Sequence, residues 1–264
     1  MHCVKILVIN YFPTRYLLPN NRYEPGDRIR LLSGLGNTYW HEVIDVLRSI
    51  IPVYDRVNRA ISLGQDRKYR EKGINVGVIS GDIVLDAGSG FGNMTSILLK
   101  NLDNKVKVVM LDPIREMLLN SKEYLSLENS KNLSCGVFEV MPFRDGSFDA
   151  VLCGYCLRDA ISLERAISEI HRILRVGGRF VIVDLGKPDN FFLRCLVSFY
   201  LKYLLGILAF LVSGKSGLKF KTLYGTYTKW PKNGELYLLL TDKFSKVIME
   251  QKLFGGAIIA VGFK

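Results

Sequence analysis

Histidine and cysteine, the side chains that most often bind zinc, are scarce in this sequence. The three histidines, His2, His41 and His171, lie far apart, and the five cysteines are an odd number in a 264-residue chain without a secretory signal pattern. We therefore expect a reducing, cytoplasmic compartment. Cys153 and Cys156 form a C-x-x-C pair, but neither a second pair nor a thioredoxin-like context accompanies it. We expect no metal, and assign the pair to packing or pocket lining.

No uninterrupted apolar run is long enough to cross a bilayer. The most apolar stretch, Phe191–Val212, is interrupted by Arg194 and Lys202, and only the ten residues Tyr203–Val212 are unbroken. Three interpretations stay open: a buried helix, a wall of a channel for an apolar substrate, or an interfacial helix whose basic side chains reach toward lipid headgroups.

Acidic residues are outnumbered by basic ones, 25 to 36, which gives a net charge of +11. A basic balance favours an anionic partner, either nucleic acid or an anionic membrane surface. The sequence has no added RNA-binding module and no Asn-Pro-Pro-Tyr-type loop, so we expect no nucleic-acid partner.

The motifs of nucleotide-binding proteins are also missing. The stretch DIVLDAGSGFGNMT (82–95) combines a short apolar strand, a glycine-rich turn and a helix start. Its glycines Gly88, Gly90 and Gly92 form G-x-G-x-G, and Asn93 stands where a dinucleotide fingerprint has its third glycine. No G-K-[ST] of a phosphate loop follows. These departures disfavour an NAD dehydrogenase.

Two carboxylates accompany the turn. Asp86 lies two positions before the first glycine, as in S-adenosylmethionine (SAM) methyltransferases, whose ligand carries a sulfonium and an amino-acid head rather than a pyrophosphate. A second strand, Lys105–Leu111, ends at Asp112, where a carboxylate can accept hydrogen bonds from both ribose hydroxyls. Both aspartates fall at strand ends in the required order, and simple loop solvation is the alternative.

Strand-like and helical patterns alternate along the rest of the chain. Further strands are expected at Leu133–Phe138, Ser147–Cys153 and Arg179–Asp184, with an amphipathic helix at Leu163–Leu174 that Gly177-Gly178 terminates, and a closing hairpin around Gly255-Gly256. Such alternation predicts an α/β fold with a doubly wound, mostly parallel seven-stranded sheet and a C-terminal antiparallel hairpin. Methyltransferase sheets have this hairpin.

Several motifs then follow one another in an order that is specific as a set. They are YDRVNRAISLG, LDAGSGFGNMT, LDPIREML, FEVMPFRDGSFDAVLCGYCLRD, HRILRVGGRFVIVDLGKP, SFYLKYLLGILAFLVSG and LYGTYTKWP. Through them the chain from about Ile44 to Lys264 resembles the C-methyltransferases of ubiquinone and menaquinone biosynthesis. The resemblance implies the Rossmann-like SAM methyltransferase fold, with SAM as cofactor.

The resemblance also implies a division of the chain. Residues 41–264 would form the methyltransferase domain, with helices at 41–75 as a lid and a helical insertion at 191–230 on the substrate side. Periodicity alone allows the first helices to be ordinary packing helices. Residues 1–40 match nothing we can place, and their role is open.

Site residues follow from the same resemblance. Those expected to hold SAM are Asp86, Gly88, Ser89, Gly90, Gly92, Thr95, Asp112 and Phe138. The small polar residue that contacts adenine in the family falls at Val137, so we expect the Phe138 backbone to replace that contact.

Members of this family methylate a ring carbon of a polyprenylated hydroquinone, such as a demethylmenaquinol or benzoquinol. The ring carbon becomes nucleophilic when the adjacent phenol loses its proton, so the site must hold a phenolate in line with the SAM methyl group. We expect Arg158 to lower the phenol pKa, Asp159 to act as base or to orient the base, and Tyr54 to close over the methionine end of SAM. A simple loop salt bridge is the alternative for Arg158 and Asp159.

Besides Val137, three further positions depart from the family pattern: Asp159 replaces the usual asparagine, Cys156 a glycine, and Val176 a proline. They leave open a SAM methyltransferase of another lipid or small aromatic, or a SAM-binding protein without turnover. A prenylated substrate together with a basic chain predicts peripheral membrane contact. A homodimer also stays open.

Overall fold

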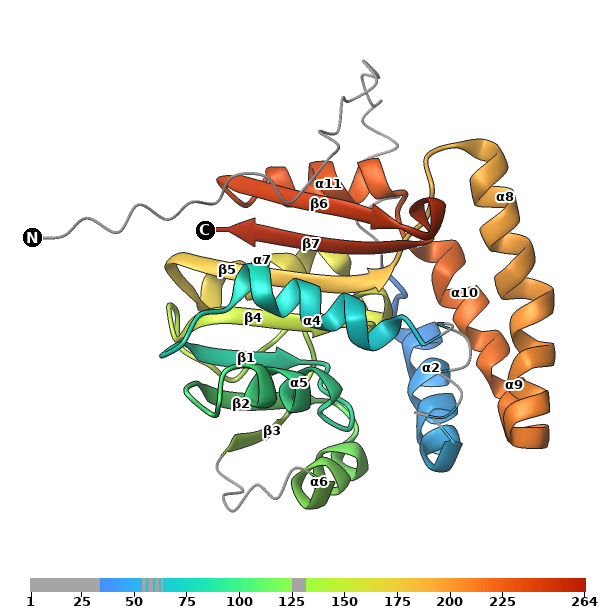
Figure 1. Cartoon of the computed structure of the whole chain (residues 1–264), viewed down its shortest axis with the longest axis horizontal. Coiled ribbons are helices and arrows are strands. Elements are labelled where there is room, and N and C mark those ends of the chain that lie inside the picture. Colours follow the sequence, from blue (N-terminus) through green and yellow to red (C-terminus); the bar gives the residue numbers. More distant parts are fainter. Residues whose placement is uncertain (1–33, 54–55, 57–58, 60–61, 63, 125–131) are drawn as a thin grey trace, which may run out of the picture.

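The computed structural model describes residues 34–264, except 54–55, 57–58, 60–61, 63 and 125–131. Within this part of the chain a seven-stranded sheet has the order β3-β2-β1-β4-β5-β7-β6. Its strands are β1 (Ile83–Ala87), β2 (Lys107–Asp112), β3 (Leu133–Cys135), β4 (Phe148–Gly154), β5 (Leu174–Leu185), β6 (Lys246–Lys252) and β7 (Ala257–Phe263). The first five are parallel, whereas β7 is antiparallel to β5 and β6. The predicted doubly wound sheet with its terminal hairpin is confirmed (Figure 1).

The centre of the sheet is buried on both faces. Val84 and Leu85 of β1, and Val151 and Leu152 of β4, have no exposed surface. Parallel strands covered on both faces are continuous apolar runs rather than alternating ones, which is why these two strands were readable in the sequence.

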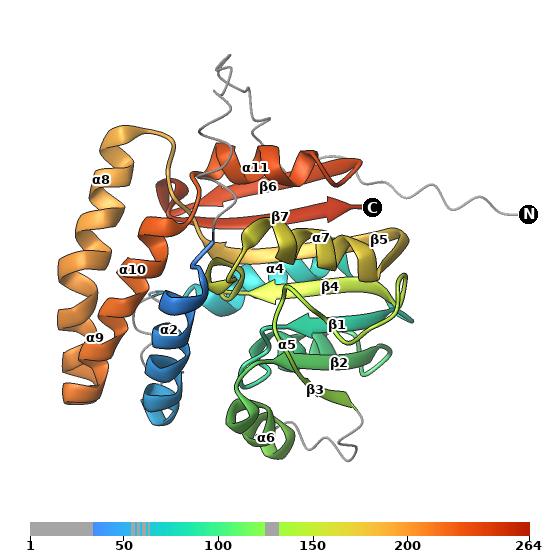
Figure 2. The ribbon, with the colours of Figure 1, turned by 180° about the vertical axis from the view of Figure 1, so that it is seen from behind.

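Helices cover the two faces of the sheet (Figures 1 and 2). On one face pack α4 (Asp66–Gly77), α5 (Asn93–Asn101) and α6 (Arg115–Tyr124), and on the other α7 (Leu163–Ile173) and α11 (Asn233–Thr241). The approach of α4 is close, because a methyl group at Gly73 or Gly77 would collide with Val183 or Val181 of β5.

A further group of helices lies beyond the carboxyl ends of the parallel strands (Figure 1). It contains α2 (Asn37–Ile50), α8 (Phe191–Phe199), α9 (Leu205–Ser213) and α10 (Thr222–Lys229). A π-helical turn, η4 (Tyr200–Leu204), joins α8 to α9, and the 3-10 helix η5 (Gly214–Lys221) leads into α10. Ligands of open α/β sheets bind at this edge, so these helices border the expected site.

The apolar stretch beginning at Phe191 differs from two of our expectations. Among the described residues, the helical stretch Phe191–Phe220 is long and apolar enough to cross a membrane by length and composition. Its straight part, the rod α8–η4–α9 (residues 191–213), ends at Gly214, where φ is 61°, and η5 packs against α9. Arg194 and Lys202 interrupt the apolar run but not the helix, so the prediction that this stretch is too short to cross a bilayer is wrong. Its most apolar window, with a mean hydropathy of 2.1, is only 22% buried, so a simply buried helix is also wrong.

Smaller differences concern element boundaries and the lid. The helix expected from His41 already begins at Asn37, and β5 starts at Leu174, before Gly177-Gly178, because Leu174 already pairs with Phe148 of β4. Of the expected lid, α2 reaches the site, whereas α4 packs on β5 and β7. The lid role of 41–75 and the substrate-side role of 191–230 stay predictions.

Candidate active site

The glycine-rich turn after β1 requires residues without side chains. Gly88, Gly90 and Gly92 have φ values of 67°, 54° and 79°, in the left-handed region that glycine adopts at no steric cost. A Cβ at Gly88 would lie 2.7 Å from Cys156 Sγ and 3.0 Å from the Phe138 ring. The turn therefore passes directly against the floor of a pocket.

Asp86 fixes the helix that follows the turn. Its Oδ2 accepts hydrogen bonds from the backbone N–H of Thr95 at 3.1 Å and from the Thr95 hydroxyl at 2.7 Å. The carboxylate is buried, which raises its pKa to about 6 although both Thr95 bonds and the charge of Arg70 act in the opposite direction. Asp86 thus orders the start of α5 and still offers Oδ1 as an acceptor.

Asp112 ends β2 and lines the pocket. Its Oδ2 accepts from the N–H of Gly90 and its Oδ1 from the N–H of Ile114, both at 2.8 Å. Each carboxylate oxygen retains a further lone pair for a ligand hydroxyl. Burial raises the pKa of Asp112 to about 6.

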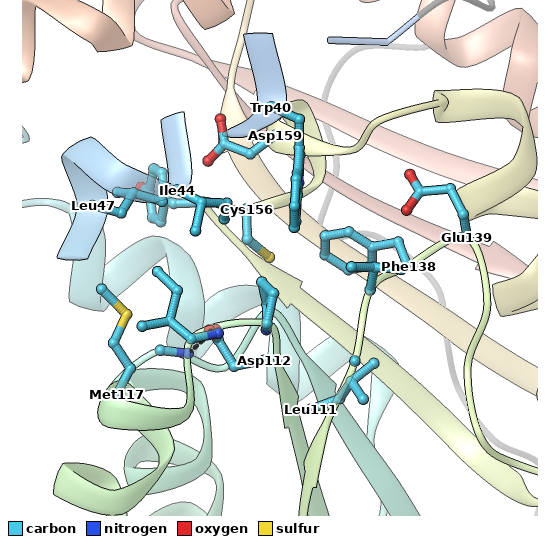
Figure 3. Close-up of a pocket in the computed structure, with 17 residues that line it drawn as sticks. Trp40, Ile44, Leu47, Leu111, Asp112, Met117, Phe138, Glu139, Cys156 and Asp159 are labelled. Atoms are coloured by element: carbon cyan, nitrogen blue, oxygen red, sulfur yellow. Dashed lines mark hydrogen bonds between the residues drawn. The ribbon is translucent and has the colours of Figure 1, made fainter. Parts of the chain in front are cut away.

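A pocket opens between α2 and the carboxyl edge of the sheet, with an empty volume of about 620 Å³ that includes space open to solvent (Figure 3). It is lined from α2 by Trp40, Ile44 and Leu47, from the sheet edge by Gly88, Gly90, Leu111, Asp112 and Gly136–Glu139, from the segment after β2 by Pro113, Ile114 and Met117, and from the segment after β4 by Tyr155, Cys156 and Asp159. The structure thus brings four predicted SAM residues to the pocket, Gly88, Gly90, Asp112 and Phe138. The other four lie in the turn or behind it: Asp86, Ser89, Gly92 and Thr95.

Three buried polar atoms near the turn have no hydrogen-bond partner among the described residues: Asp86 Oδ1, Ser89 Oγ and Arg70 Nε. They are an anionic acceptor, a hydroxyl and a cationic donor. A ligand that carries an ammonium, hydroxyls and a carboxylate would satisfy such a set, and SAM has all three groups. The residues present therefore fit the predicted cofactor.

The C-x-x-C pair lies at this pocket. Cys153 is buried in β4, and Cys156 lines the cavity with its Sγ 3.1 Å from the Ala87 carbonyl oxygen. A hydrogen bond with Cys153 and burial raise the pKa of the Cys156 thiol. This environment disfavours a reactive thiolate and matches the packing and lining role expected from the sequence.

Arg158 forms an ion pair that the sequence analysis missed. Its Nη1 lies 2.5 Å from Asp184 Oδ1 and donates to the Tyr155 carbonyl at 2.7 Å, while its Nε lies 3.8 Å from Asp159 Oδ1. Asp184, at the end of β5, is completely buried. The cation is therefore held between two carboxylates, and the predicted loop salt bridge is present alongside any catalytic role.

Asp159 lies where two cavities meet. It lines the pocket described above and also a second, mostly apolar cavity of about 410 Å³ between α2 and α10. Burial raises the pKa of Asp159 to about 6, while Arg158 and a hydrogen bond with Thr226 act to lower it. A carboxyl group with this pKa can exchange a proton near neutral pH.

Two further residues of the site escaped the sequence analysis. Arg70 of α4 is 6% exposed, lies over the Tyr155 ring at 4.8 Å, and has its Nη1 3.4 Å from the Gly154 carbonyl oxygen. Glu139 lines the pocket and accepts from the N–H of Ser162 at 3.0 Å. An arginine on the glycine-containing inner face of α4 was the available signal for the first. The position of Tyr54 lies outside the described residues.

The raised pKa values predict opposite pH dependences for folding and for cofactor binding. Asp86 and Asp112 bind protons more readily in the folded chain, so their contribution to stability is full below the ordinary value of 3.8 and is lost as pH rises through about 6. Ribose hydroxyls donate to the charged form of Asp112, so affinity for SAM should fall below about pH 6. We expect SAM to raise the melting temperature less at about pH 5 than at about pH 7.5. An equal increase at both would contradict this assignment.

Comparisons with known proteins identify the chain's relatives. The model of the ubiE/COQ5 methyltransferase family matches residues 34–264. The ubiquinone/menaquinone biosynthesis C-methyltransferase UbiE of Geotalea uraniireducens is 27% identical over 228 residues, which cover 84% of this chain and 96% of that protein. The demethylmenaquinone methyltransferase of Lactiplantibacillus plantarum is 32% identical over 160 residues, 59% of this chain and 68% of that one.

Solved structures share the fold at low sequence identity. A SAM-dependent methyltransferase of Thermotoga maritima, described as a possible histamine N-methyltransferase, has a TM-score of 0.56 and 16% identity, covering 82% of this chain and 99% of that one. A SAM-dependent methyltransferase from Aquifex aeolicus has a TM-score of 0.51 and 15% identity, covering 79% and 96%.

Proposed function

Since the chain belongs to the ubiE/COQ5 methyltransferase family, we propose that it transfers the methyl group of SAM to a ring carbon of a polyprenylated hydroquinone in quinone biosynthesis. SAM supplies an electrophilic methyl group. The observation that carries the proposal is the meeting of a cofactor pocket and an apolar cavity at one ionisable side chain, Asp159.

The second cavity suits the ring and the first part of an isoprenoid chain. Val43, Val46 and Ile50 of α2 line one side, and Phe220 and Leu223 line the other. The relatives named above act on quinone precursors by their names, and a 2-phytyl-1,4-naphthoquinone methyltransferase of Nostoc is 32% identical over 156 residues. An apolar wall with a few polar groups at one end would hold such a molecule with its hydroxyl toward Asp159.

Asp159 is the proposed general base. It takes the proton of the substrate hydroxyl, so that the electrons of the ring carbon beside it form the new carbon–carbon bond as the sulfur–methyl bond breaks. The electron pair of that bond stays on sulfur. The ring carbon then releases its own proton to water, which restores the aromatic ring as a phenolate, and the protonated Asp159 returns its proton to the ring oxygen. Hydrogen bonding to Thr226 and the nearby Arg158 cation keep the pKa of Asp159 from rising further.

Arg158 is proposed to act on the developing phenolate and on Asp159. It lines the second cavity, and its guanidinium lies beside both Asp159 and Asp184. Because Asp184 already neutralises much of its charge, we assign it a smaller electrostatic role than the sequence alone suggested. The closing role of Tyr54 stays a prediction from the family resemblance.

Arg70 is proposed to bind the carboxylate of the methionine end of SAM. Its buried Nε lacks a partner among the described residues, and its charge acts on Asp86 beside the glycine-rich turn. We expect Arg70→Met to weaken SAM binding by about 10- to 100-fold, the value of a hydrogen bond to a charged group. Decarboxylated SAM should bind the variant and the wild type about equally well. Equal losses for both ligands in calorimetric titrations would instead indicate a structural role for Arg70.

A defined pair of acceptors tests the substrate class. A prenylated naphthohydroquinone should be methylated with a KM well below that of the same ring without its prenyl chain, because the apolar cavity binds the chain. Equal KM values, or transfer only to an unrelated lipid or aromatic, would favour the alternative of another substrate. Bound SAM without any transfer would favour the non-catalytic alternative.

We also propose a cytoplasmic enzyme that contacts the membrane peripherally, since its substrate dissolves in lipid and its net charge is +11. The homodimer stays a prediction.

A further inference from the structure

The rod α8–η4–α9 (residues 191–213) presents a continuous apolar face to solvent. Its large side chains that are more than half exposed include Phe192, Leu196, Phe199, Tyr203, Ile207 and Leu211. These six recur at intervals of three or four residues, which places them on one side of a helix. We refer to them as the outer apolar face. Soluble monomers rarely expose a contiguous patch of this kind without a partner.

The opposite side of the rod is part of the enzyme. Leu201, Leu205 and Ala209 are buried against Ile50 of α2 and Tyr227 of α10. In Figures 1 and 2 the rod is the outermost element beyond α10 and α2, on the side where the parallel strands end. A helix packed along one side in this way is not surrounded by lipid, which favours an orientation in the plane of a membrane over one that spans it.

The charges around this face have one sign. From 190 to 234 the sequence contains one arginine and six lysines and no acidic residue. Arg194 lies at the start of the rod, where it donates to the Pro188 and Asp189 carbonyls at 3.0 and 2.7 Å, and Lys202 lies over the Tyr203 ring. Lys215 and Lys219 are exposed on η5, which follows the rod. Basic side chains that flank an apolar face match the anionic headgroups of a phospholipid surface.

We propose that the outer apolar face docks on an anionic phospholipid surface, with the rod lying in the interface. The docking proposal assigns the membrane contact of the proposed function to a specific surface, and it rests on that contact. The cavity at Asp159 is lined by Lys219 and Phe220 of η5, which follows the rod and packs against α9. Docking would therefore bring the apolar cavity next to the lipid from which a prenylated substrate must enter.

Two native cysteines allow a position-specific test. Cys195 is exposed on the rod, and Cys135 is exposed on β3, at the sheet edge next to β2. We would label Cys3→Ser/Cys135→Ser and Cys3→Ser/Cys195→Ser proteins with acrylodan and add vesicles of phosphatidylcholine and phosphatidylglycerol. We expect a blue shift in emission for the label at Cys195 and none at Cys135. No shift at Cys195, or equal shifts at both, would overturn the proposal.

Exposed substitutions provide a second test that does not endanger folding. Leu196→Gln/Leu211→Gln should lower partitioning onto these vesicles about tenfold or more, because both leucine side chains leave water when the face docks. The matched control, Ile79→Gln/Val176→Gln, removes two exposed apolar side chains elsewhere and should partition as the wild type does. Equal partitioning of both double variants would contradict the proposal.

Other occupants of this face give different results. A second copy of the chain would shift the Cys195 label without vesicles, increasingly with protein concentration. A spanning helix would keep the protein on vesicles at high salt and alkaline pH. Either result would overturn interfacial docking, and neither measurement needs a methyl acceptor, so the outcome is independent of the proposed reaction.

Discussion

Asp159→Asn is expected to lower kcat about 100-fold and to leave SAM affinity within about twofold of the wild type, because loss of a positioned base typically costs this much. The amide retains the shape of the carboxylate and its contact with Thr226, but it cannot accept a phenol proton. Asparagine is nearly isosteric with aspartate, so the substitution should be tolerated by the fold.

The pH profile separates a base from a positioning residue. In the wild type, log kcat should rise with pH through about 6, since Asp159 must be ionised to accept the proton. Asp159→Asn should lose this limb. Thr226→Val removes a hydrogen bond that lowers the pKa of Asp159 and should move the limb to higher pH. An Asp159→Asn protein with normal kcat and an unchanged limb would show that Asp159 is not the base.

Asp112→Ala is expected to weaken SAM binding about 100-fold, since hydrogen bonds to charged groups each contribute about 1.5–3 kcal/mol. The carboxylate is the predicted acceptor of the ribose hydroxyls, and it also holds the Gly90 and Ile114 N–H groups. Calorimetric titration with SAM and with S-adenosylhomocysteine measures the effect, which should be equal for both because their riboses are identical.

Asp112→Asn is the control for structure. The amide retains an oxygen acceptor for only one of the two backbone N–H groups, so the melting temperature should fall, but less than in Asp112→Ala, while SAM binding is still weakened. If Asp112→Asn binds SAM as the wild type does, the carboxylate is not the ribose acceptor. If Asp112→Ala fails to fold, this conservative variant still decides the question.

Local signals in the sequence were sufficient for the fold and for the cofactor turn. The runs that became β1 and β4 are buried on both faces, so their apolar composition alone identifies them as strands. Gly88, Gly90 and Gly92 need left-handed backbone, so the glycines themselves identify the turn. Asp86 and Asp112 could be placed because they end neighbouring strands of a parallel sheet, whose carboxyl ends share one edge.

The residues that sequence reasoning missed act across long separations. Asp184 meets Arg158 because β5 lies beside β4, and Arg70 reaches Gly154 from a helix 84 positions earlier. No local sequence pattern predicts either contact. The length of the rod (residues 191–213) is hidden in the sequence for another reason: two charged residues interrupt its apolar run without ending the helix. Arg194 donates to the Pro188 carbonyl at its start, and the Lys202 side chain lies at its surface.

Methyl transfer from labelled SAM into a total quinone extract, reduced in one sample and oxidised in the other, tests the central claim most directly. The proposed mechanism requires a phenol whose proton Asp159 removes, and only the reduced ring has one. We predict label in a quinone-class lipid in the reduced sample and none in the oxidised sample. Equal labelling of both samples, or label only in a lipid of another class, would contradict phenol-driven C-methylation by this enzyme.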